Sequence, residues 1–114
     1  MDPRVRTLLD DIQQASRLVE HFAGARSFDD YLNDPLLRSG VERQLEIIGE
    51  ALNQLAKVDP DDAARITDHH RRIIALRNIL VHGYARIDHR VIWNILERSL
   101  PALRREVDAL LRGP

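Results

Sequence analysis

The 114-residue sequence predicts an all-α fold, a four-helix bundle with short accessory helices. Three observations carry this prediction. Apolar residues recur three and four positions apart along most of the chain, the spacing of an amphipathic helix. The dipeptide Asp-Pro, typical of a helix N-cap followed by proline in the first turn, occurs three times. No stretch alternates apolar and polar residues with the period of two that indicates a β-strand.

The first helix is expected at about 3–23, after the N-cap Asp2. Its apolar positions are Val5, Leu8, Leu9, Ile12, Ala15, Val19 and Phe22. A short helix or turn is expected at about 28–33, where Ser27 and Asp30 have the spacing of a capping box. Gly24, Gly83 and Gly113 stand where helices are expected to end.

The second long helix is expected at about 35–57, after Asp34. Its core positions are Val41, Leu45, Ile48, Leu52 and Leu55. A short piece at 60–66 follows Asp59 and leads into a third helix at about 69–82.

A fourth helix is expected at about 89–112, with Asp88 as its candidate cap and a kink at Pro101. Its apolar positions are Val91, Ile95, Leu96, Leu100, Leu103, Val107 and Leu110. The chain therefore reads as a single helical domain over 1–114.

Composition narrows the function classes. Seventeen basic residues against 18 acidic ones leave a net charge of −1, which excludes a chain that coats nucleic acid with its whole surface but allows a local basic patch. The absence of cysteine excludes a disulfide scaffold, a thiol nucleophile and a thiolate metal site. No apolar run is long enough to span a bilayer, so a cytoplasmic protein without membrane contact is the expectation.

Polar residues gather at the end of the third predicted helix. At about 100° per residue, Arg77 falls inside the apolar arc centred on Ile73. A guanidinium aimed at a core is costly unless it is paired. Asn78 and His82 are four residues apart and share one face beside that arc. His82 directly precedes Gly83, where the helix dipole favours the protonated imidazole.

Spacing alone leaves two readings of this cluster open. In one, Arg77 pairs with a carboxylate of the preceding helix, Glu46 or Glu50, and His82 only caps its own helix. In the other, Arg77, Asn78 and His82 form a reactive site. The flanking arginines are equally open to two readings, an RNA-facing patch or a solvated surface; they are Arg71, Arg72, Arg86 and Arg90.

No metal or cofactor site is expected. His69 and His70 are adjacent and point about 100° apart on a helix, so they do not chelate one ion as a helical pair. His21 and His89 are isolated in the sequence.

The segment Arg77-Asn78-Ile79-Leu80-Val81-His82-Gly83-Tyr84 resembles the Arg-x4-His-x-Tyr motif of HepT toxins. These toxins are a subgroup of the HEPN domains (higher eukaryotes and prokaryotes nucleotide-binding). The segments 45–52, Ser27-Phe28 and Val91-Ile92-Trp93 are also similar to that subgroup, so the resemblance covers about residues 4–110. One departure is the stretch 69–72, His-His-Arg-Arg, where the family often has a tryptophan.

The resemblance implies a metal-independent endoribonuclease, the toxin of a toxin–antitoxin pair. Arg77 and His82 would then be catalytic, with Asn78 in support. Cleavage through the 2′-hydroxyl of RNA needs an acid/base near neutrality and a cation for the phosphate, which these residue types supply. The family also implies a nucleotidyltransferase antitoxin, MntA-like, that transfers AMP to Tyr84.

A homodimer is expected, because a two-step acid/base mechanism needs more than one histidine and a second copy of the chain supplies the other. Ile47 and Ala51 fall outside the main core arc of their helix, which suggests an apolar stripe completed by a partner. The alternative function is a non-enzymatic helical module that only binds a nucleotidyltransferase, with Arg77 and His82 in structural roles.

Overall fold

The computed structural model describes residues 1–66, 69–82 and 87–113; within these ranges the side chains of His69, His70, Arg72, Ile79 and His82 are not described. All regular structure in this part of the chain is helical, so the all-α prediction is confirmed. The elements are α1 (Pro3–Ala23), α2 (Phe28–Asn33), α3 (Pro35–Val58), α4 (Pro60–Ala64), α5 (His69–His82), α6 (His89–Asn94), η1 (Ile95–Ser99) and α7 (Leu100–Arg112).

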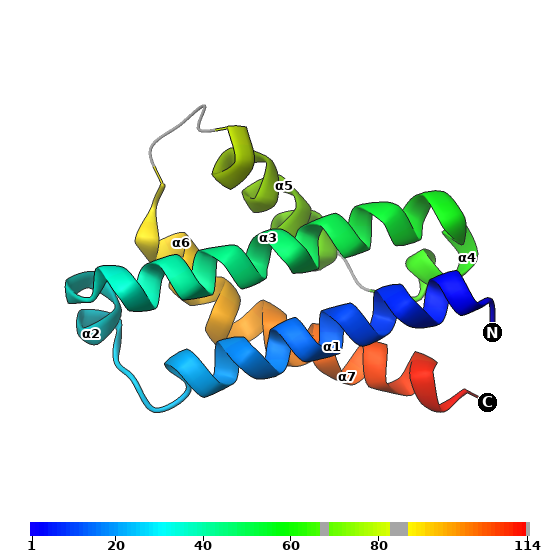
Figure 1. The fold of residues 1–114 in the computed structure, drawn as a ribbon, viewed down its shortest axis with the longest axis horizontal. Helices are drawn as coiled ribbons and strands as arrows, with labels where there is room; N and C mark the ends of the chain where they lie inside the picture. Colours follow the sequence, from blue (N-terminus) through cyan, green and yellow to red (C-terminus); the bar gives the residue numbers. More distant parts are fainter. Residues whose placement is uncertain (67–68, 83–86, 114) are drawn as a thin grey trace.

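Four helical segments run back and forth along the molecule (Figure 1). Helices α1 and α3 lie side by side over most of their length, α5 packs on α3, and α7 packs on α1. The short helices α2 and α4 lie at opposite ends of the bundle, and both chain termini lie at the α4 end (Figure 1). This arrangement leaves α1 and α5 on either side of an outward strip of α3.

The predicted helix starts are confirmed by their capping bonds. The side chains of Asp2, Asp34, Asp59 and Asp88 each accept a hydrogen bond from a backbone N–H in the first turn of the following helix. Ser27 and Asp30 form the reciprocal capping box at the start of α2. Helices α1 and α7 end directly before Gly24 and Gly113, whereas Gly83 lies outside the described residues.

The core is aliphatic, as the low aromatic content predicts. All five predicted core side chains of α3 are at most 2% exposed. Tyr31 of the short helix α2 is also completely buried. The prediction for α6 is wrong by one position, because Val91 is exposed and its neighbour Ile92 is buried instead.

The single helix predicted over 89–112 is interrupted. Residues Ile95–Ser99 form a π-helical turn, in which the N–H of Leu100 donates to the carbonyl of Ile95, five residues back. The proline that follows explains the wider turn. Pro101 has no N–H to donate to the carbonyl of Glu97, and its ring crowds that carbonyl. The disturbance therefore lies just before Pro101, as a widened turn.

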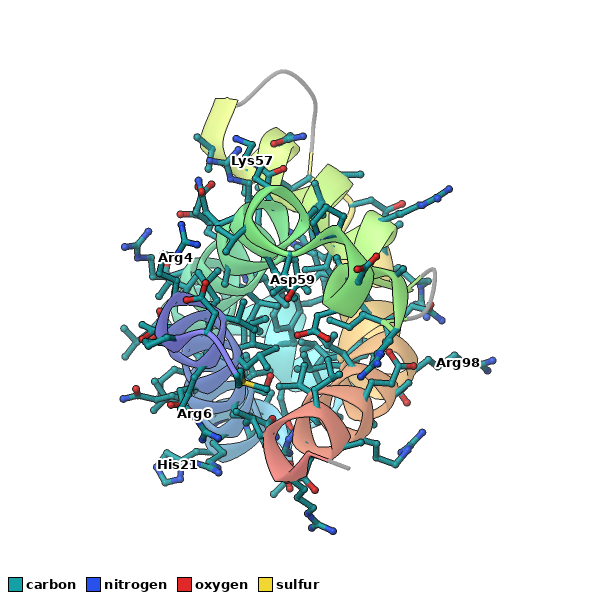
Figure 2. The ribbon with its side chains drawn as sticks, turned by 90° about the vertical axis from the view of Figure 1, so that its right-hand side faces the viewer. Arg4, Arg6, His21, Lys57, Asp59 and Arg98 are labelled. Carbon is teal, nitrogen blue, oxygen red and sulfur yellow. The ribbon has the colours of Figure 1, made fainter. Side chains whose placement is uncertain are left out.

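Two side chains offered as evidence for a dimer behave differently. Ala51 is only 6% exposed and belongs to the core of one protomer, so that part of the argument is wrong; the small side chain fits beneath its neighbours. Ile47 packs against the core but stays half-buried. Charged side chains cover the outside; Arg4, Arg6, His21 and Arg98 project away from the bundle (Figure 2). Among the described residues, no helix is long and apolar enough to cross a membrane.

Candidate active site

A groove of about 300 Å³ follows the outward strip of α3, between α1 and α5. It is lined by the middle of α3, by the first half of α1 and by the end of α5. The lining residues are Leu8, Asp11, Arg43, Glu46, Ile47, Glu50, Ala51, Gln54, Arg77 and Val81. The lining therefore mixes apolar side chains with charged ones.

Arg77 lies at the rim of this groove, with its side chain 23% exposed. Its Nη2 atom is 2.5 Å from Oε2 of Glu50, and its Nη1 atom donates a 2.8 Å hydrogen bond to Oδ1 of Asn78. The sequence placed Arg77 inside an apolar arc. In the structure, Arg77 lies where this arc leaves the core. Val81, on the same side of the arc, is 48% exposed and lines the groove, so this side of α5 does not face the core.

Glu50 also has a hydrogen-bond partner on its own helix. Gln54, one turn later on α3, donates a 2.9 Å hydrogen bond from Nε2 to Oε1 of Glu50. The other oxygen, Oε2, is buried, and among the described residues its contact is the ion pair with Arg77 rather than a hydrogen bond of good angle. The carboxylate thus has one oxygen on the amide and one on the guanidinium.

The other candidate partner, Glu46, has a different contact. Its Oε2 atom lies 3.2 Å from Nη1 of Arg43, within the same helix. Glu46 and Glu50 both line the groove, yet only Glu50 reaches Arg77 in the described structure. The two carboxylates, one helical turn apart, therefore have separate arginine partners.

Gly49 brings the two helices close at this point. A Cβ atom built on Gly49 would lie 2.5 Å from Cβ and 3.0 Å from Cγ of Arg77, and 3.2 Å from the carbonyl oxygen of Ile73. Real Cβ atoms essentially never come within 3.0 Å of another atom, so the 2.5 Å contact would force a shift. The absence of a side chain at Gly49 is therefore what allows α5 to lie against α3 at Arg77.

His82 is the last residue of α5, five residues beyond Arg77 on the same helix. At 1.5 Å per residue, the two Cα atoms are separated by about 7.5 Å along the helix axis. The imidazole of His82 and all of Tyr84 lie outside the described residues. The helix therefore brings the backbone of His82 to the end of the groove where Val81 and Arg77 lie.

Of the four arginines that flank the motif, the two with described side chains do not line the groove. Arg71 is exposed near the start of α5. Arg90 of α6 lies over the ring of Phe28, 4.2 Å from its centroid, at the α2 end of the molecule. Arg86 and the side chain of Arg72 lie outside the described residues. Among the described side chains, no three of His, Asp or Glu lie together as metal ligands.

The amino-acid sequence matches a family model described as "HepT-like: Ribonuclease HepT-like" over residues 12–110. The chain belongs to the HepT-like ribonuclease family. A "Probable ribonuclease HepT" of Thermococcus cleftensis is 34% identical over 104 residues, which cover 90% of this chain and 91% of the relative. "Putative RNase TTE0752" of Caldanaerobacter subterraneus subsp. tengcongensis is 32% identical over 101 residues, 89% and 88% of the two chains. No solved structure matches the chain at a significant level.

In this HepT-like chain, sequence reasoning missed Gly49 and Gln54. Both had a signal. A glycine inside a long helix costs stability, so it indicates close packing by another element. Gln54 stands four residues after Glu50, the spacing at which helical side chains meet. Neither signal names the partner, because that partner comes from α5.

Proposed function

We propose that this chain is a metal-independent endoribonuclease that cleaves RNA through the substrate's 2′-hydroxyl, with Arg77 and His82 as catalytic residues. The family to which it belongs is one of ribonucleases. The observation that carries the proposal is the Arg77 guanidinium, held by Glu50 and Asn78 at the rim of an open groove. A planar cation in a fixed orientation is suited to a phosphate.

The chemistry assigns one task to each residue. His82 removes the proton of the 2′-hydroxyl, whose oxygen attacks the neighbouring phosphorus. The bond from phosphorus to the 5′-oxygen then breaks, which leaves a 2′,3′-cyclic phosphate and a free 5′-hydroxyl. Arg77 stabilises the charge of the pentavalent phosphate. One of its five N–H donors makes the hydrogen bond to Asn78 and Nη2 forms the ion pair with Glu50, so the substrate would use other donors of the guanidinium.

We further propose that two copies form a homodimer with a composite site. The leaving 5′-oxygen needs a proton donor, and a second copy supplies a second His82 and a second Arg77. The groove supports this arrangement, because Val81 is exposed and Leu8 and Ile47 are half-buried beside the charged residues. Apolar surface of this kind is suited to a partner helix.

The proposed biological setting is a toxin–antitoxin pair in the cytoplasm. A nucleotidyltransferase of the MntA type would transfer AMP to Tyr84, two residues beyond His82. The added phosphate would carry negative charge and bulk to the place where an RNA phosphate must lie. AMP on Tyr84 would therefore block cleavage without altering Arg77 or His82.

The test is cleavage of a defined RNA by purified protein. His82→Ala should lower the rate by about 10²–10⁴-fold, the usual contribution of a general acid/base, with little change in thermal melting. Arg77→Lys keeps the charge and loses the planar fork, so it should also lose most activity. His21→Ala, at an exposed histidine of α1, is the matched control and should cleave like wild type.

Two outcomes would decide against the proposal. A folded His82→Ala protein that cuts RNA at the wild-type rate would refute the catalytic role of His82. The alternative function, a non-enzymatic module that binds a nucleotidyltransferase, would then be favoured. Cleavage that EDTA abolishes and Mg²⁺ restores would contradict the metal-independent mechanism. Sedimentation at micromolar concentration tests the dimer separately, since a monomer there would exclude the composite site.

A further inference from the structure

We infer that Glu50 is a positioning residue for Arg77, and that it sets the orientation in which the guanidinium meets an RNA phosphate. The inference rests on the proposed ribonuclease function. It adds a role for the Gly49-Glu50 dipeptide of α3, which the proposed chemistry does not use. Figure 1 shows α5 lying against α3, the helix that carries this dipeptide.

The contacts fix the guanidinium from two sides. Glu50 holds Nη2 at 2.5 Å, and Asn78 accepts from Nη1 at 2.8 Å. Because the guanidinium is planar, contacts on its two terminal nitrogens, together with its attachment to the side chain through Nε, restrain the direction of its plane. The edge that remains for a phosphate is then set before substrate arrives, which is the condition for electrostatic catalysis.

Glu50 is restrained in its turn. Gln54 donates to Oε1, so the carboxylate presents Oε2 to Arg77. Gly49, the preceding residue, acts on Arg77 itself, since any Cβ there would collide with Cβ of Arg77. Three residues of α3, a glycine, the carboxylate next to it and an amide one turn later, thus act together on one arginine of another helix.

A purely stabilising role fits this pair poorly. Although the Oε2 atom itself is buried, the Glu50 side chain as a whole is 42% exposed, and partly exposed ion pairs contribute little to folding. A carboxylate in a groove that receives RNA also repels the phosphates of the substrate. Its position there is understandable if ordering Arg77 outweighs that repulsion.

The experiment separates kcat from KM for RNA cleavage. Glu50→Ala should lower kcat by about 10- to 100-fold, the loss expected when a reacting group is misplaced by about 1 Å. KM should stay unchanged or fall, because a negative charge has left the groove. Glu50→Gln keeps an acceptor of the same size and should retain more kcat than Glu50→Ala, while its melting temperature stays close to that of wild type.

The control is another ion pair between two helices. Glu20 of α1 pairs with Arg104 of α7, outside the groove. Glu20→Ala removes a comparable contact and should leave kcat unchanged. A double-mutant cycle adds the decisive comparison, since Glu50→Ala should cost nothing further in a protein that already carries Arg77→Ala.

Failures of the two proposals are distinguishable. A wild-type protein that cuts no RNA overturns the ribonuclease function, and this role with it. Wild-type cleavage that Arg77→Lys abolishes while Glu50→Ala and Glu50→Gln leave kcat intact overturns the positioning role alone. A Glu50→Ala loss that persists in full on the Arg77→Ala background also overturns it. If Glu50→Ala does not fold, Glu50→Gln is used in its place: a reduced kcat supports the positioning role, and a wild-type kcat overturns it.

Discussion

Helix α3 takes part in two regions that are built differently. Its core side chains, among them Leu45, Ile48 and Leu52, are buried with aliphatic residues of the other helices. Its outward strip meets α5 through Gly49 and Glu50, where single atoms determine the contact. Apolar burial is roughly proportional to area and has no direction, whereas an arginine at a rim depends on the position of each partner. Changes in the first region should alter stability, and changes in the second should alter activity.

The core region should show the largest loss of stability. Leu45 is completely buried, so Leu45→Ala removes apolar contacts and leaves a cavity. We expect the free energy of unfolding to fall by about 2–5 kcal/mol. Urea denaturation measures this loss, and RNA cleavage per folded molecule should stay near the wild-type value. A stable Leu45→Ala protein with lost activity would reverse the comparison.

The rim should respond to a single methyl group. In Gly49→Ala the new Cβ collides with Cβ of Arg77 and lies close to the carbonyl of Ile73, so α5 must shift away from α3. Overpacking of this kind costs about 1–3 kcal/mol, partly offset by the helix propensity that alanine gains. We expect kcat to fall by about as much as it does in Glu50→Ala, because the shift of α5 moves Arg77 away from Glu50.

Gly40→Ala supplies the matched change on the same helix. There the new Cβ would lie 3.3 Å from two ring atoms of Phe22, a contact that a small ring movement relieves. Thermal melting and kcat are measured for both variants. Equal effects at Gly40 and Gly49 would show that backbone propensity, and not the approach of α5, explains the result.

The same contrast explains how far the sequence could predict the structure. Helix starts followed from local chemistry, because an aspartate before a proline caps the helix it precedes wherever that helix packs. The core of α3 followed from periodicity alone. Helices α1, α3 and α7 each have one clear apolar side, and burial needs no more than that.

The rim could not be predicted to the same depth. Glu46 and Glu50 stand one turn apart on one helix, and the choice between them depends on how far α5 is shifted along α3. That shift results from packing at Gly49, which involves residues distant in sequence. The π turn before Pro101 is similar, since proline predicts a disturbance but leaves open which carbonyls rearrange.

The start of α3 should show a smaller, pH-dependent effect. Asp34 accepts from the N–H groups of Leu36 and Leu37 and pairs with Arg26. The Leu37 N–H bond, with help from Arg26, holds the pKa of Asp34 below its ordinary value of 3.8. A lowered carboxyl pKa stabilises the fold above the unfolded value, and that stability is lost as pH falls through the folded pKa.

Asp34→Ala should therefore lower the melting temperature at pH 7 by less than Leu45→Ala. Its melting temperature should also fall less steeply with acid below the ordinary carboxyl pKa of 3.8, because the stabilising carboxylate is already absent. Melting from pH 2 to 7 measures both effects. Asp10→Ala, at an exposed carboxylate of α1, is the control and should keep the wild-type acid slope. An unchanged slope for Asp34→Ala would show that this cap is not what acid disrupts.

Glu42 should show the smallest effect, and with the opposite sign. Burial raises its pKa above the ordinary value of 4.5, an effect only partly offset by His89 and Arg38. Tyr31, whose own pKa is raised mainly by burial and also by the charge of Glu42, is a further group whose titration is coupled to it. A raised carboxyl pKa stabilises the fold below the unfolded value, and this stability is lost as pH rises through the folded pKa.

Glu42→Gln imitates the protonated form, so it should match wild type at pH 4 and melt slightly higher at pH 7. Glu50→Gln is the comparison two turns along α3, where the carboxylate has Arg77 beside it and no such gain is expected. A Glu42→Gln protein that melts lower than wild type at pH 7 would mean that the ionised group is paired in the fold, as Glu50 is.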